Sequence, residues 1–172
     1  MKEDILFEIN YLSLKVDNFK KKKQQLLDML KDYPDYRKVN QNFFTNRQTD
    51  RSGMAEKFKK ICAKEFATFN EKTKKHMIIE DIWSVRYGQG DFHPIHNHGS
   101  VGLTGILYLQ TDKEDSTVYV QPWNDHLTDM TGYHKLRVDE GTMVITPRFV
   151  NHFTNPHQST RDRIVIAFDI TV

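Results

Sequence analysis

The C-terminal half of the chain alternates apolar and polar residues with the two-residue period of a β-strand. The last run is the clearest, because Ile164, Ile166, Phe168 and Ile170 would share one face of a strand over residues 163–172. Other runs rich in β-branched and aromatic residues, separated by clusters of Gly, Pro, Asn and Asp, predict strands at residues 77–87, 103–110, 117–121, 135–138 and 142–146. So many short strands predict an antiparallel sandwich or barrel of the jelly-roll type.

The N-terminal half is richer in helix signals. An early strand with a bulge or break is predicted between Ile5 and Val16, and Asn18 is a suitable N-cap for a helix through Leu30. Pro34 lies just beyond the end of that helix. The lysine run 20–23 within it favours a solvated helix face over a nucleic-acid contact.

A second helix is predicted over about Gly53 to Lys75. Its apolar residues recur at three- and four-residue steps and would cover a sheet; they are Met54, Phe58, Ile61, Cys62, Phe66 and Phe69. Because Cys62 lies on this stripe, a buried structural thiol is favoured over a nucleophile.

The chain has 172 residues, which is enough for one domain with a real core. The element pattern predicts a mainly β fold with flanking helices and a double-stranded β-helix (jelly-roll) core. We expect a single domain over 1–172, with a helix-rich support over 1–76 and the core, with a metal site, over 77–172.

Composition and charge limit the kinds of partner and the cellular compartment that we expect for this protein. A net charge of +2 is nearly balanced, so nucleic acid is not an expected partner. Cys62 is the only cysteine, which excludes an intrachain disulfide and fits a reducing compartment. No stretch approaches the roughly 20 apolar residues that cross a bilayer, and Met1 to Asp4 lack a signal-peptide pattern, so we expect a cytoplasmic protein without a membrane partner.

Histidines cluster between residues 93 and 98. In an extended strand His96 and His98 project from the same face, whereas His93 would point the other way, as a substrate-side or outer residue. His152 follows a second turn-then-strand pattern. Two ligands from one strand and one from a distant strand would let a β-barrel hold a metal with open coordination positions. The spacing alone leaves a coincidental cluster as an equal alternative.

Four motifs then occur in a characteristic order. They are Tyr87-Gly88-Gln89-Gly90, nine residues before His96 when counted from the tyrosine; the run 104–109 with Tyr108; the turn and strand 141–152; and Arg163, eleven residues after His152. This order resembles the prolyl 4-hydroxylase-like superfamily of Fe(II)/2-oxoglutarate-dependent oxygenases. The resemblance covers residues 82–172, about half of the chain.

The resemblance implies a role for each of these residues. His96, His98 and His152 would bind Fe(II), and Arg163 would hold the distal carboxylate of 2-oxoglutarate through two-point contacts, with Tyr108 and Tyr87 beside it. The implied activity is that of a dioxygenase. It consumes 2-oxoglutarate and O₂ and hydroxylates an unidentified substrate, for which a prolyl residue in a peptide is one candidate.

The sequence departs from the family pattern at one ligand. Where the family has H-x-D, this chain has His98, which makes the metal site one unit more positive and also suits Zn, Cu or Ni. This H-x-H form resembles a small subgroup of these oxygenases from phages and marine bacteria. In another register His98 would be the first ligand and water would fill the position of Ser100.

Two other functions are weighed against this one. The first is a three-histidine metal oxygenase that does not use 2-oxoglutarate, and the second is a non-catalytic jelly-roll module with structural or Zn-binding histidines. Arg163 could equally be a surface residue of a strand, and Tyr108 a core aromatic residue. Polar or aromatic residues near the ligands in sequence could line a substrate pocket; they are Trp83, Arg86, His93, Trp123 and Arg148.

Overall fold

The computed structural model describes residues 8–38, 41–112, 115 and 117–172. The expected features at Met1 to Asp4, and the first residues of the strand expected from Ile5, lie outside these ranges. In chain order the elements are β1 (Leu12–Lys15), α1 (Phe19–Lys31), β2 (Phe44–Thr45), α2 (Met54–Ile61), α3 (Ala63–Thr73), β3 (Ile78–Tyr87), β4 (Leu103–Gln110), β5 (Thr117–Asn124), β6 (Thr131–Lys135), β7 (Thr142–Pro147), β8 (His152–Thr154) and β9 (Arg163–Thr171).

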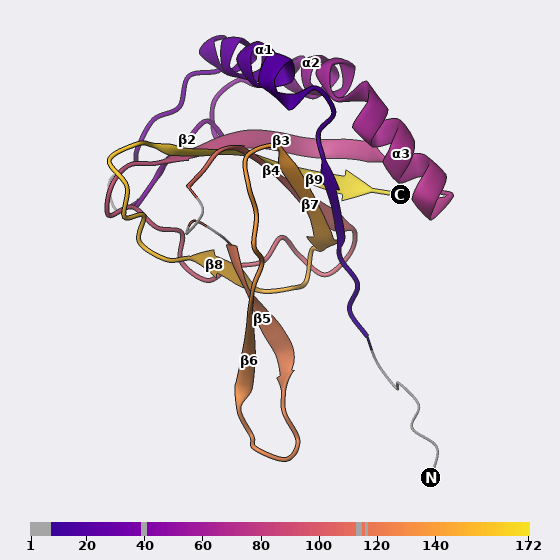
Figure 1. Cartoon of the computed structure of the whole chain (residues 1–172), viewed down its shortest axis with the longest axis vertical. Helices are drawn as coiled ribbons and strands as arrows, with labels where there is room; N and C mark the ends of the chain where they lie inside the picture. The colour runs from indigo at the N-terminus through magenta and orange to yellow at the C-terminus, as the bar shows by residue number, and fades with distance from the viewer. Residues whose placement is uncertain (1–7, 39–40, 113–114, 116) are drawn as a thin grey trace.

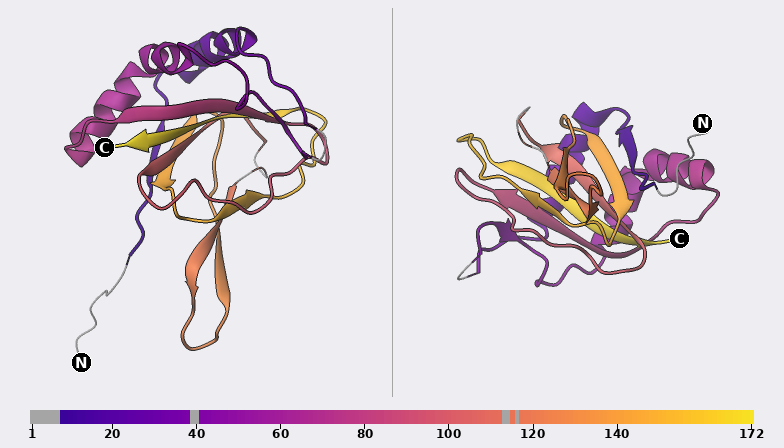
Figure 2. Two further views of the ribbon diagram at one scale, coloured as in Figure 1. Left: turned by 180° about the vertical axis from the view of Figure 1, so that it is seen from behind. Right: turned by 90° about the horizontal axis from the view of Figure 1, so that it is seen from below.

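The strands form two antiparallel sheets. The larger has the order β1-β7-β4-β9-β3-β2, and the smaller has the order β6-β5-β8. The three helices lie along one face of the larger sheet, while the β5–β6 hairpin extends from the opposite side of the molecule (Figures 1 and 2). This arrangement confirms the predicted mainly β fold with flanking helices and a jelly-roll core.

The larger sheet buries both of its faces, and β9 divides its side chains between them. Ile166, Phe168 and Ile170 pack against the helices, whereas Val165 and Ala167 face the core between the two sheets. The alternation predicted for this strand is therefore confirmed. Gly105 on β4 accommodates the ring of Phe168, because a Cβ at residue 105 would lie 2.2 Å from a ring carbon.

The second predicted helix is interrupted. Cys62 ends α2 and begins α3, with φ −101° and ψ 26° in place of helical values. Its side chain is fully buried, and burial, followed by the nearby Glu65 carboxylate, raises the pKa of the thiol to about 12. The apolar stripe continues across the break, so a periodicity argument could not detect a change confined to one residue.

The first helix starts after Asn18, as predicted, but the side chain of Asn18 makes no capping hydrogen bond. Asn18 instead adopts the left-handed conformation, with φ 54°, which asparagine tolerates better than most residues. The lysine run is only partly solvated. Lys22 pairs with the buried carboxylate of Glu65 at 2.7 Å, and Lys23 pairs with Glu140 at 2.7 Å.

The prediction of a strand at residues 135–138 is wrong beyond Lys135. β5 continues to Asn124 and pairs with β6, which begins at Thr131 and ends at Lys135. Leu136 and Val138 are nevertheless buried in the core between the sheets. Their alternation therefore reflects burial in an irregular segment and not ladder pairing. None of the helices in the described residues has the length and apolar character needed to span a membrane.

Candidate metal centre

The segment that carries His96 and His98 is not the regular strand that the spacing predicted. Its only bridge is an isolated one, in which His96 and His152 exchange backbone hydrogen bonds of 3.0 and 2.8 Å. The amide of His98 donates to the carbonyl of Arg148 at 3.0 Å. Pro94 has no amide to donate, and Gly90 and Gly99 have positive φ, so a continuous ladder cannot form here.

The three histidines nevertheless converge. Their candidate ligand nitrogens all lie within 4.8 Å of one another. The ring of His152 lies 4.3 Å from that of His96 and 5.2 Å from that of His98, measured between centroids. His152 is 3% exposed, and the side chain of His98 is 4% exposed. The cluster is therefore largely shielded from water.

Each of the three rings is held through its Nδ1 atom by an acceptor. The acceptors are the Pro94 carbonyl for His96 (2.8 Å), the Val150 carbonyl for His152 (3.1 Å) and the Asp169 carboxylate for His98 (2.8 Å). Carbonyl and carboxylate oxygens only accept hydrogen bonds, so each Nδ1 carries the proton. Each Nε2 then keeps a lone pair that is available to a metal, which is the usual arrangement around metal-binding histidines.

Burial also favours the neutral form of two of the imidazoles. Burial, reinforced by the neighbouring His96, lowers the pKa of His152 to about 3, and burial lowers the pKa of His96. Neutral imidazole is the form that binds metals. Three imidazole nitrogens fit a divalent cation such as Fe(II), and they also suit Zn, Cu or Ni.

Strand parity predicted that His93 would point away from the cluster, but its side chain lies against the cluster. Its ring stacks on that of His96 with centroids 3.9 Å apart and an interplanar angle of 16°. Its Nδ1 lies 3.2 Å from the hydroxyl of Tyr87. Burial, reinforced by the cluster histidines, lowers the pKa of His93 to about 2. The irregular backbone at Pro94 removes the alternation on which the prediction depended.

Arg163 is a buried cation, with 3% of its surface exposed. Its guanidinium carbon lies 5.1 Å from the ring centre of Tyr87 and 5.6 Å from that of Tyr108. Thr117 Oγ1 accepts hydrogen bonds from the Tyr108 hydroxyl at 2.8 Å and from Arg163 Nη2 at 3.4 Å. Arg163 Nε is buried and makes no hydrogen bond to any residue that the structure describes.

No carboxylate of the described residues lies within ion-pair distance of Arg163. A buried guanidinium in this state is costly, and a bound carboxylate would compensate it. The site therefore fits a carboxylic acid ligand as well as a metal. The Tyr108 hydroxyl, expected beside such a ligand, already donates to Thr117 and would have to turn toward it.

The histidine cluster and Arg163 line one small cavity. Its volume of about 30 Å³ leaves room for about one water molecule. A dicarboxylic acid would therefore need lining side chains to move apart. Besides the three candidate ligands, the cavity is lined by His93 and by Arg47, whose side chain is half exposed.

The residues suggested for a substrate pocket separate into two groups. Trp83 lies at the cluster, where it stacks on His98 at 5.4 Å, and His93 stacks on His96. Arg86 is instead held by Asp35 and Asp162, Arg148 is paired with Glu80, and Trp123 lies half exposed on β5. Sequence reasoning did not propose Asp169 as part of the site. Its shared parity with Arg163 on β9 was the signal that could have found it.

A jelly roll that brings a histidine cluster and the buried Arg163 together in one cavity fits a metal site beside a site for a carboxylic acid. Residues 81–169 match the sequence profile of the family described as "Putative 2OG-Fe(II) oxygenase". The match spans half of the chain, so the chain belongs to this family, whose metal and cosubstrate are Fe(II) and 2-oxoglutarate. No curated protein matches the chain.

Solved structures of such oxygenases share the fold. A 2OG-Fe(II) oxygenase family oxidoreductase from Burkholderia pseudomallei has a TM-score of 0.71 at 12% identity, over 94% of this chain and 84% of that one. HygX from Streptomyces hygroscopicus, solved with nickel and 2-oxoglutarate, has a TM-score of 0.70 at 12% identity, over 94% and 82%. A Pseudomonas putida prolyl-4-hydroxylase has a TM-score of 0.61 at 10% identity, over 94% and 92%.

Proposed function

We propose that this protein is an Fe(II)/2-oxoglutarate-dependent dioxygenase that hydroxylates a substrate still to be identified. His96, His98 and His152 would hold the metal through their Nε2 atoms. Arg163 would bind the distal carboxylate of the cosubstrate, with Tyr87 and Tyr108 on either side of the guanidinium. The observation that carries the proposal is the pairing, in one cavity, of a three-histidine cluster with a buried arginine.

The protein's own residues would have four tasks. The hydrogen bonds that the Nδ1 atoms donate fix the orientation of the three imidazoles and place the ring proton on Nδ1, so that Nε2 is the nitrogen left for the metal. Arg163 offers a planar fork that matches a carboxylate, and the flanking tyrosine rings exclude water from that pair. When bound, Fe(II) would activate O₂, which is the oxidant, and 2-oxoglutarate would be oxidised to succinate and CO₂ as the co-reductant while a substrate C–H bond is hydroxylated.

The test is a coupled assay of the purified, Fe(II)-loaded protein. We expect succinate to form from 2-oxoglutarate with matching O₂ consumption, and His152→Ala to lose both metal binding and succinate formation. Tyr36→Phe, which removes an exposed hydroxyl outside the cavity, is the control and should change neither. Slow uncoupled turnover without substrate is sufficient for this readout.

The same assay distinguishes the two other functions. O₂ consumption that needs the metal but not 2-oxoglutarate would identify a three-histidine oxygenase. Metal binding without O₂ consumption under any condition would identify a non-catalytic module. A prolyl residue in a peptide is one substrate to test, since the fold is shared with a prolyl-4-hydroxylase.

A further inference from the structure

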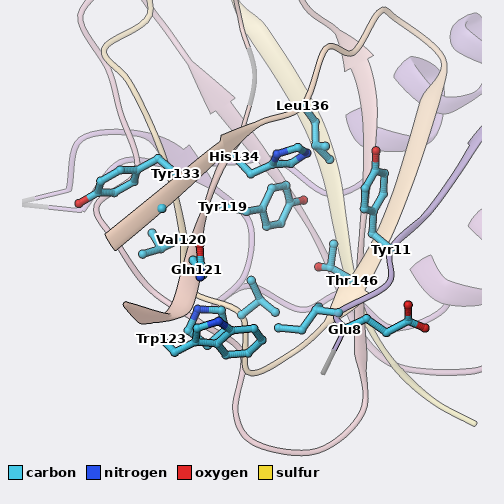
Figure 3. Close-up of a pocket in the computed structure, with 14 residues that line it drawn as sticks. Glu8, Tyr11, Tyr119, Val120, Gln121, Trp123, Tyr133, His134, Leu136 and Thr146 are labelled. Atoms are coloured by element: carbon cyan, nitrogen blue, oxygen red, sulfur yellow. The ribbon is translucent and has the colours of Figure 1, made fainter. Parts of the chain in front are cut away.

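A second, larger cavity lies between the N-terminal segment, the end of β7 and the β5–β6 hairpin (Figure 3). Its volume is about 500 Å³, within the range of pockets that hold small organic ligands. Tyr119 lies near the centre of its wall, with Tyr11 on one side and Tyr133 on the other (Figure 3). Trp123 adds a further aromatic face.

Two contacts connect this cavity to the histidine cluster. Tyr119 on β5 is the register partner of His152 on β8, and their rings lie 5.6 Å apart. Val150 also lines the cavity, and its carbonyl accepts the hydrogen bond from His152 Nδ1. The two sites are therefore separated by about one layer of side chains.

The wall of the cavity selects ligands by charge. The lining residues in the described part of the chain include no lysine or arginine, and His134 is exposed, so a buried anionic group would lose its hydration without gaining a fixed opposite charge. The one carboxylate, on Glu8, already accepts a hydrogen bond from Asn10 at 2.8 Å and is solvent-exposed. An uncharged ligand with rings that pack on the aromatic faces fits this wall.

One polar atom in the wall is left without a partner. The hydroxyl of Tyr119 is buried and has Thr146 as a polar neighbour, but it makes no hydrogen bond of good geometry to the described residues, while Tyr119 as a whole is 7% exposed. A buried unsatisfied hydroxyl costs free energy, so a ligand that accepts a hydrogen bond there would gain affinity.

We propose that this cavity binds an uncharged, ring-containing small molecule whose carbonyl, hydroxyl or ether oxygen accepts a hydrogen bond from Tyr119. A layer of side chains separates this cavity from the histidine cluster, so the ligand is distinct from the substrate of the proposed reaction. Binding in the cavity itself does not depend on a metal. The two proposals therefore fail separately.

The experiment follows the two tryptophan side-chain NH signals of ¹⁵N-labelled protein by NMR, with and without Zn(II). Trp123 lines the cavity, whereas Trp83 lies at the histidine cluster, so each signal reports on one site. The probes are acetophenone, its anionic counterpart benzoate, toluene and a short proline-rich peptide. We expect acetophenone to shift the Trp123 signal in both metal states and to bind at least several-fold more tightly than benzoate or toluene.

Tyr119→Phe should weaken acetophenone binding about fivefold and leave toluene binding unchanged, as expected for loss of one hydrogen bond. Tyr11→Phe is the matched control, because its side chain lines the same cavity but is 46% exposed. Equal binding of benzoate, no shift of Trp123, or no effect of Tyr119→Phe would overturn the proposal. Preferential binding of the peptide would overturn it in favour of a peptide groove.

Discussion

Asp169 on β9 accepts a hydrogen bond of 2.8 Å from Nδ1 of His98. The carboxylate also lies 3.8 Å from the guanidinium of Arg148 and 3.9 Å from that of Arg47. The family pattern that the sequence resembles would have an aspartate where this chain has His98. Here a carboxylate lies directly behind the imidazole, where it can offset part of the positive charge of a bound metal.

Asp169→Asn tests this relationship. The variant keeps the shape of the side chain but removes its charge, so we expect metal affinity to fall by about 10- to 100-fold. Competition with a chelator, using Zn(II), measures the dissociation constant without any need for activity. Asp112→Asn removes an exposed carboxylate and is the control. Unchanged affinity in Asp169→Asn would show that the carboxylate does not support the metal.

Arg163→Met separates stability from cosubstrate binding. We expect the affinity of the metal-loaded protein for 2-oxoglutarate to fall by about 150-fold or more, because losing one partner of a buried charge pair costs about 3–5 kcal/mol. Without cosubstrate the thermal midpoint should stay the same or rise, since an unpaired buried cation is removed. Calorimetric titration and thermal unfolding measure the two effects. Arg161→Met, in an exposed ion pair, should not change cosubstrate binding.

Cys62 should resist alkylation. Burial, followed by the charge of Glu65, raises the pKa of its thiol to about 12, so almost no thiolate forms at pH 8. We expect iodoacetamide to leave the folded protein unmodified and to add one group per chain in guanidinium chloride. Mass spectrometry gives a clear readout because the chain has one cysteine. Rapid modification of the folded protein would contradict the buried position.

His157 should make stability depend on pH. Burial alone would lower its pKa, but hydrogen bonds to the Arg161 carbonyl (2.7 Å) and the Asp115 carboxylate (2.9 Å) outweigh burial and raise the pKa above 6.5. A raised folded-state pKa stabilises the protein below the unfolded-state value, and this contribution is lost as pH rises through the folded-state pKa. Urea unfolding should therefore show a larger loss of stability for His157→Gln at pH 5.5 than at pH 8.5. An equal loss at both pH values would mean that the ring is neutral throughout.

Much of this architecture could be predicted from periodicity. The alternation in β9 reflects a strand with two buried faces, and the apolar stripe around Phe58 and Phe66 reflects helices that pack on a sheet. These patterns are repeated along many residues, so one irregular position does not hide them. The break at Cys62 and the unpaired segment around Pro94 involve single residues, and period alone cannot reveal them.

The candidate site was predictable to a similar extent. Residue type and order predicted that His96, His98 and His152 form one site, and their rings lie close together in the structure. The position of His93 depended on backbone regularity that Pro94 removes. The roles of Asp169 and Tyr119 depend on contacts between distant strands, which a single sequence does not contain. The subgroup defined by His98 in place of aspartate stays a prediction.

β9 carries Arg163 near its start and Asp169 near its end, on the face opposite Phe168. A slip of one residue along this strand would swap its two faces. Both charged groups would then leave the site, and the ring of Phe168 would no longer lie beneath the helices. Any sequence change that loosens the helical layer over β9 should thus misalign the two ends of the reaction centre together. Substitutions in this helical layer, far from the cavity, should therefore lower turnover while the protein stays folded.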